Sequence, residues 1–215
     1  MRIVFIFMIF SYSLMAENLI FKPDGKYKIL SNLHLVNDIE YKKDNNYQAL
    51  IEIPAGVREK WEVNHKSGHL EWEFQDKKPR KVKFLGYPGN YGFIPQTILE
   101  KKDGGDGDPL DIIVLDASVK KGTIQKIRVL GAIKLLDSGE QDDKIIAISI
   151  NGAFSKINTL SQMMIEFPGS IEIIRYWFEG YKGNKMQFMG YMKRDKAESL
   201  VEKAHKSWSN HQNVH

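Results

Sequence analysis

An acidic hexapeptide that ends at Asp111 contains the side chains with the most evident chemistry. Its carboxylates belong to Asp106, Asp108 and Asp111, and Gly107 and Pro109 separate them. In an extended chain the first two would face one side and the third the other, but Gly and Pro allow a turn that brings all three together. Converging carboxylates repel one another unless a cation lies among them, so the pattern predicts a divalent-metal site. The alternative is a solvated acidic hairpin loop, the common role of Asp- and Gly-rich loops.

A second acidic turn and an acid inside a strand add candidate ligands. The alternating run 124–136 is typical of a long strand interrupted at Gly131, and it leads into the acidic segment 137–144. Glu52 lies within the apolar strand 49–54, where a carboxylate needs a partner or a ligand to offset its loss of hydration. An edge-strand carboxylate that faces water is the alternative for Glu52.

The elements that must position these residues are mainly strands, with helices near the C-terminus. Apolar alternation and bounding turn residues predict strands at 49–54, 60–63, 70–74, 112–115, 124–136, 145–150 and 186–192. The stretch 84–98, rich in Gly, Pro and aromatic residues, is expected to form an ordered irregular loop. Helical spacing predicts a short helix at 157–167, another from near Ser170 to Gly183, and a C-terminal amphipathic helix at 197–208. These elements indicate one α+β domain of mainly β structure.

Composition indicates an ordinary globular chain and excludes several kinds of site. The chain is 42% hydrophobic and 27% charged, with a formal net charge of +4. The absence of cysteine excludes disulfides, thiolate metal sites and a cysteine nucleophile. The six histidines show no HExxH or similar spacing, which argues against a zinc site. Nucleic-acid binding is not expected, because there is no recognisable motif and the basic run 77–83 is typical of a solvated face.

The N-terminus has the pattern of a secretory signal. A single Arg precedes an unbroken apolar run from Ile3 to Phe10, and small-residue cleavage options follow before the polar chain begins at Glu17. The run is too short to span a bilayer as a helix, so no stable membrane span is expected. We therefore expect export, to the periplasm or the medium, with residues 1–16 as the signal. Cleavage after Ala16 places Leu14 at the −3 position, whereas cleavage after Ser13 places Ser at both −3 and −1, so the sequence leaves both sites open. The alternative is an apolar first strand of a cytoplasmic protein.

Six segments together resemble the soluble family I inorganic pyrophosphatases. They are IEIP (51–54), KWE (60–62), GYPGNYGFIPQT (86–97), DGDPLDIIVL (106–115), LLDSGEQDDK (135–144) and EGYKG (179–183), in the family's order over roughly residues 48–195. The resemblance implies a small OB-like five-stranded β-barrel with flanking helices, homo-oligomeric assembly, and hydrolysis of pyrophosphate to two orthophosphates by metal-activated water. It also implies several Mg²⁺ ions per active site, with Mn²⁺ or Zn²⁺ as substitutes. The chain then divides into the signal 1–16, an N-terminal extension 17–46, a pyrophosphatase domain 47–208 and a polar tail 209–215.

The resemblance implies a role for each matching residue. Asp108 matches the residue next to the attacking water, assigned as the general base. The matching metal ligands are Asp106, Asp111, Asp137, Asp142 and Glu52. The matching substrate contacts are Lys60, Arg80, Tyr91, Lys144, Tyr181 and Lys182, with Glu62 and Tyr87 as supporting residues. Pyrophosphate is a compact polyanion, so oxygen ligands for Mg²⁺ and basic groups for phosphoryl oxygens suit it.

Two other functions remain open on the sequence. An exported, Ca²⁺-stabilised β-barrel binding module without catalysis would also use acidic loops, although the spacing after Asp106 does not fit an EF-hand. A phosphatase that forms an aspartyl-phosphate also places two Asp residues two apart, but it requires an apolar strand before them, and residues 101–105 are polar. A cytoplasmic location, usual for the resembling family, is the alternative to export.

Overall fold

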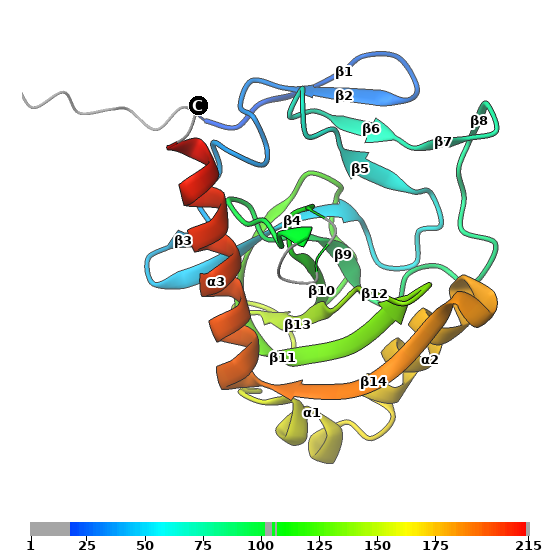
Figure 1. Ribbon diagram of the computed structural model, residues 1–215, viewed down its shortest axis with the longest axis vertical. Helices are drawn as coiled ribbons and strands as arrows, with labels where there is room; N and C mark the ends of the chain where they lie inside the picture. Colours follow the sequence, from blue (N-terminus) through cyan, green and yellow to red (C-terminus); the bar gives the residue numbers. More distant parts are fainter. Residues whose placement is uncertain (1–17, 102–104, 106, 214–215) are drawn as a thin grey trace, which may run out of the picture.

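The structure is a computed structural model that describes residues 18–101, 105 and 107–213 (Figure 1). Its strands are β1 (Phe21–Pro23), β2 (Lys28–Ser31), β3 (Lys42–Lys43), β4 (Asn46–Ile53), β5 (Trp61–Val63), β6 (Leu70–Trp72), β7 (Phe74–Gln75), β8 (Lys78–Pro79), β9 (Asn90–Phe93), β10 (Asp111–Leu115), β11 (Ile124–Asp137), β12 (Glu140–Gln141), β13 (Lys144–Ser149) and β14 (Met186–Lys193). The α-helices in the described part are α1 (Leu160–Glu166), α2 (Ser170–Tyr181) and α3 (Arg194–Gln212). Nowhere in this part is a helix both long and apolar enough to cross a membrane.

Five strands close into a barrel. β4 pairs with β9 and β9 with β10, both antiparallel, and β10 pairs with β13 in parallel. β13 pairs antiparallel with β11, and β11 returns to pair with β4, which completes the ring. The register of β11 shifts between Val129 and Gly131, and such a bulge lets a long strand bend around a barrel. The predicted OB-like five-stranded barrel is confirmed. The predicted interruption at Gly131 is not a break, because β11 runs continuously through that residue and only its register against β13 shifts there.

Two apolar clusters hold helices against the barrel. Alternate residues of the barrel strands face opposite sides, as strand geometry requires. One set packs with Ala197, Val201 and Ala204 of α3, so the predicted C-terminal amphipathic helix covers one flank of the barrel (Figure 1). The other set packs with residues of α1, α2 and the β5–β6 pair. α3 continues through Gln212, so residues 209–212 of the expected polar tail are helical.

The N-terminal segment is part of a sheet. β1 pairs with β2, β2 pairs with β6, and β6 pairs with β5, all antiparallel. β5 carries the predicted site residue Glu62 and follows Lys60 directly, so the extension from residue 18 onward joins the sheet that borders the site instead of only covering the domain. The proposed signal, residues 1–16, falls outside the described residues.

The stretch 84–98 is not an irregular loop throughout, because it contains β9 in the middle of the barrel. A Cβ added to Gly92 would lie 1.8 Å from the carbonyl oxygen of Leu50 on β4. Gly92 therefore permits the backbones of β4 and β9 to approach each other. A glycine in the sequence is equally consistent with such a close approach and with a turn, so the sequence does not distinguish the two. The prediction of a loop was wrong for Asn90–Phe93.

Candidate active site

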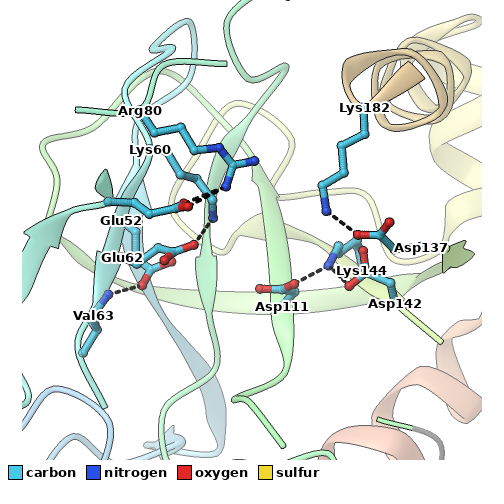
Figure 2. Close-up of polar contacts among 11 residues, drawn as sticks. Glu52, Lys60, Glu62, Val63, Arg80, Asp111, Asp137, Asp142, Lys144 and Lys182 are labelled. Carbon is cyan, nitrogen blue, oxygen red and sulfur yellow. Dashed lines mark hydrogen bonds and ion pairs between the residues drawn. The ribbon is translucent and has the colours of Figure 1, made fainter. Parts of the chain in front are cut away.

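One cavity of about 630 Å³ gathers the predicted site residues from six strands, the loops beside them and the end of α2. Figure 2 shows most of these side chains. Every predicted residue that the structure describes, except Tyr87, lines it. These residues are Glu52, Lys60, Glu62, Arg80, Tyr91, Asp108, Asp111, Asp137, Asp142, Lys144, Tyr181 and Lys182. The cavity also has lining residues that the sequence did not predict, namely Asn64, His65 and Lys66 from the turn between β5 and β6.

Lys144 lies between two carboxylates at the centre of the site. Its ammonium contacts Asp111 at the start of β10 and lies 2.6 Å from Asp142 Oδ1 (Figure 2). β10 and β13 are parallel neighbours, so Asp111 and Lys144 begin adjacent strands at the same end of the barrel. The Lys144 side chain is 3% exposed. Burial alone would lower the pKa of Lys144, but the carboxylates of Asp111 and Asp142 outweigh it and raise the pKa above the usual lysine value.

A second lysine holds the acidic turn at the end of β11. Lys182 Nζ, just after α2, lies 2.5 Å from Asp137 Oδ2 (Figure 2). Burial alone would raise the pKa of Asp137, but the hydrogen bond and charge of Lys182 lower it overall. The ammonium group of Lys182 thus reaches the cavity from the helical side while Asp137 reaches it from the barrel.

A third lysine pairs with an acid on β5. Lys60 Nζ lies 2.6 Å from Glu62 Oε1, on the same strand face two residues away. Burial acts to lower the pKa of Lys60, but Tyr87, Glu62 and Glu52 together raise it. Lys60 is therefore a cation held close to the cavity wall.

Glu52 is turned into the interior by a bulge in β4. In the β4–β9 register, Ile51 faces Gly92 and Ile53 faces Tyr91, so Glu52 has no opposite residue. Its Oε1 accepts a hydrogen bond of 2.7 Å from the backbone N–H of Val63 on β5. Glu52 is 6% exposed, which excludes a water-facing edge carboxylate. Burial raises the pKa of Glu52 to about 8, against the opposing effects of Lys60 and the Val63 N–H.

A backbone hydrogen bond with Lys60, the residue before β5, positions Arg80 at the cavity. The Lys60 N–H donates to the Arg80 carbonyl at 3.1 Å, which places the two basic residues side by side. Arg80 Nη1 donates to both carboxylate oxygens of Glu73, at 2.8 and 2.7 Å. Glu73 was not predicted; it orients the guanidinium from behind and leaves the rest of that group directed at the cavity.

Two tyrosines with different positions stand behind the carboxylates. Tyr91 of β9 lines the cavity, and burial raises its pKa well above the usual value. Tyr87 packs against Tyr91, with ring centroids 5.0 Å apart, and against Trp177 of α2 at 4.4 Å. Tyr87 is thus a buried support for the cavity wall and not one of its lining residues. Both phenols stay neutral donors at neutral pH.

Asp108 is the most exposed of the predicted acids that the structure describes, and it contacts His65. Its side chain is 60% exposed, and His65 Nδ1 lies 3.3 Å from Asp108 Oδ1. The hydrogen bond from His65 lowers the pKa of Asp108, and the same bond raises the pKa of His65. A lone histidine in a hairpin turn gives no sequence signal for this contact, since its partner lies far along the chain.

The donor chemistry of the cavity fits Mg²⁺. Its acids offer carboxylate oxygens, the hard ligands that Mg²⁺ prefers. Within the described residues, no three acidic or histidine side chains already form a group that could hold an ion. Lysine ammoniums lie against Asp111, Asp142 and Asp137 instead. A preformed cage is not required, because Mg²⁺ binds through one or two carboxylates, waters and substrate phosphate. Asp106, also predicted as a ligand, lies outside the described residues.

Comparison with known proteins gives matches over most of the chain. The family model described as "Inorganic pyrophosphatase" matches residues 49–209. An inorganic pyrophosphatase of Drosophila melanogaster is 33% identical, and the match covers 85% of this chain and 60% of that protein. The chain thus spans about three fifths of that relative's length.

Solved structures share the fold. The type I inorganic pyrophosphatase of Toxoplasma gondii superposes with a TM-score of 0.83 at 24% identity, over 90% of this chain and 98% of that one. A truncated vacuolar soluble pyrophosphatase of Trypanosoma cruzi, solved in complex with PPi, gives a TM-score of 0.81 at 22% identity, over 99% of each chain. At these identities the likeness establishes the barrel with its flanking helices.

Proposed function

The chain belongs to the inorganic pyrophosphatase family, and we propose that it hydrolyses inorganic pyrophosphate to two orthophosphates. The observation that carries the proposal is the composition of the cavity. Among the described residues that line it, six are Asp or Glu and five are Lys or Arg. A neutral or apolar ligand would not pair with these acidic and basic groups. A polyanion bound together with divalent cations pairs with both, because the basic groups contact the polyanion and the acidic groups contact the cations. The related T. cruzi protein, which binds PPi, supports this substrate.

Mg²⁺ is the cofactor that the acids of the cavity suit, with Mn²⁺ or Zn²⁺ as substitutes. Asp111, Asp137, Asp142 and Glu52 are the described residues that would hold it, together with Asp106. When bound, Mg²⁺ supplies neutralisation of phosphate charge and a water of lowered pKa.

Asp108 is suited to remove the proton from the attacking water. A general base must be ionised before the reaction, and the hydrogen bond from His65 keeps the pKa of Asp108 below its usual range. Its exposed carboxylate at the cavity rim is accessible to water. The water attacks one phosphorus directly, the bridging P–O bond breaks, and the proton passes to Asp108; no aspartyl-phosphate forms.

The basic residues bind phosphoryl oxygens and stabilise the charge that develops on the leaving phosphate. Lys60, Lys144 and Lys182 each contact a carboxylate of the cavity. Once those carboxylates have another cation to neutralise them, each ammonium is free to donate to phosphate. Tyr91 and Tyr181 add hydroxyl donors, and Arg80 adds a planar donor already oriented by Glu73.

Phosphate release from purified protein with pyrophosphate, in the presence and absence of Mg²⁺, tests the proposal. Mg²⁺-dependent release that is abolished by chelation supports it, and Asp108→Asn serves as the matched control of much lower activity. Absence of turnover, combined with a melting temperature raised by Ca²⁺, would instead indicate the non-catalytic binding module. A phosphorylated aspartate trapped by acid quench would indicate the aspartyl-phosphate mechanism.

We further propose that the protein is exported through residues 1–16 and assembles as a homo-oligomer. The signal pattern supports the first proposal and the family supports the second. Light scattering coupled to size exclusion measures the assembly, and a monomeric mass at micromolar concentration would contradict it.

A further inference from the structure

The turn between β5 and β6 delivers a histidine to the predicted general base. His65 lines the cavity, and its Nδ1 lies 3.3 Å from Asp108 Oδ1. The side chain of Asp108 is 60% exposed, so packing alone does not restrict its carboxylate. His65 is thus a hydrogen-bond donor that can select one orientation of this carboxylate.

The turn itself is rigidly built. The Asn64 side chain Oδ1 accepts from the backbone N–H groups of Lys66 and Ser67, at 3.0 and 3.1 Å. The Gly68 N–H donates to the Asn64 carbonyl at 2.8 Å. Gly68 has φ of 68°, in the left-handed region that glycine adopts without strain. His65 therefore projects from a closed turn and not from a free loop.

The N-terminal extension holds this turn through residues that do not line the cavity. His34 Nε2 lies 3.2 Å from the His65 carbonyl, and the Leu35 N–H donates to the Gly68 carbonyl at 3.3 Å. The His34 N–H in turn donates to Asp38 Oδ2 at 2.7 Å. A Cβ on Gly68 would lie 2.6 Å from the His34 Cα, so the two segments are in close contact. The extension thus fixes the backbone that carries His65.

We propose that His65 is a positioning residue for the reaction, which donates a hydrogen bond from Nδ1 to Asp108 and aims its carboxylate at the attacking water. The inference rests on the proposed function and adds to it a residue that neither the sequence motifs nor the resemblance assigns. Misplacement of a base by a fraction of an ångström slows proton removal without weakening substrate binding.

The test compares two substitutions at His65. His65→Ala removes the donor, whereas the amide nitrogen of His65→Asn stands close to the position of Nδ1 and restores it. We expect His65→Ala to lower kcat on the order of tenfold with KM unchanged, and His65→Asn to recover most of the loss. Equal kcat values for the two variants, or a change confined to KM, would overturn the proposal.

A double-mutant cycle with Asp108→Asn separates positioning from general damage. If His65 acts through Asp108, His65→Ala lowers kcat no further once Asp108 is replaced. If His65→Ala lowers kcat by the same factor in the Asp108→Asn protein as in the wild type, His65 does not act through Asp108.

The matched control is His69→Ala, at the end of the same turn. His69 Nδ1 accepts from the Ser31 N–H at 3.2 Å, and His69 does not line the cavity. We expect a lower melting temperature and an unchanged kcat; a kcat loss equal to that of His65→Ala would refute the specific role. Absence of turnover in the unaltered protein would contradict the proposed function itself, whereas normal turnover in both it and His65→Ala contradicts only this inference.

Discussion

Glu52→Gln should make the stability of the metal-free protein less dependent on pH. Glu52 is 6% exposed, and burial raises the pKa of its carboxyl group to about 8 from 4.5. A carboxyl group whose pKa is raised in the folded state makes its full contribution to the free energy of unfolding at pH values below its pKa in the unfolded state. That contribution is lost as the pH rises through its pKa in the folded state. The loss therefore develops between about pH 4.5 and pH 8 and is constant above. Glutamine keeps the acceptor for the Val63 N–H and cannot ionise.

The size of the effect follows from the shift. The difference between 8 and 4.5 is 3.5 pKa units, and each unit corresponds to about 1.4 kcal/mol, or about 5 kcal/mol in total. Between pH 5 and pH 9 the wild-type protein should lose about 4 kcal/mol relative to Glu52→Gln. For a chain of this length that difference corresponds to roughly 8–16 °C in melting temperature.

The assay is thermal unfolding in EDTA across this pH range. We expect the melting temperature of Glu52→Gln to exceed that of the wild type by an amount that grows with pH. Glu166→Gln is the control, because that side chain is exposed at the end of α1 and relieves no buried charge. A difference in melting temperature between the wild type and Glu52→Gln that stays constant from pH 5 to pH 9 would refute the reasoning.

Three other outcomes are expected. Asp108→Asn should retain Mg²⁺ affinity in calorimetric titration but lower kcat by about 100-fold or more; unchanged turnover at saturating Mg²⁺ would exclude the role of general base. Lys144→Met leaves Asp111 and Asp142 without their shared cation, so urea unfolding of metal-free protein should show a loss of about 3 kcal/mol. Mg²⁺ should restore more stability to this variant than to the wild type, and an equal response would contradict the idea that the ammonium and the metal ion serve the same carboxylates. Intact mass of exported protein should correspond to cleavage after Ser13 or after Ala16, and a mass that retains the whole N-terminus would contradict the signal.

The strands and helices with strong local patterns were predictable. β10 and β13 are continuous apolar runs, and α3 repeats its apolar residues at helical spacing, so each is specified by nearby residues. β9 was missed because Gly92 allows close contact with β4, which is distant in the sequence, whereas the sequence suggested a turn. The pairing of β2 with β6, and of β1 with β2, was missed for a similar reason, since scattered apolar residues in a polar segment do not reveal which sheet edge they join.

For the site too, local features were predictable and long-range contacts were not. Side-chain type and order along the chain are local properties, and they were sufficient to select the acids and bases that line the cavity. The contacts of Arg80 with Glu73 and of Asp108 with His65 join segments whose spacing carries no signal, so they were not predicted. Asp106 was selected by the motif and lies outside the described residues.

The sequence alone determined which charges this protein carries, and that two of its acidic segments are turns at strand ends. Only the tertiary structure decided their electrostatic state. Closure of β11 on β4 completes the barrel, the bulge at Glu52 places that carboxyl group in the interior, and burial there raises its pKa. Lys144 remains charged at 3% exposure because two carboxylates from different elements converge on it. Burial and the distance between charges depend on how remote segments pack, and no local pattern specifies either.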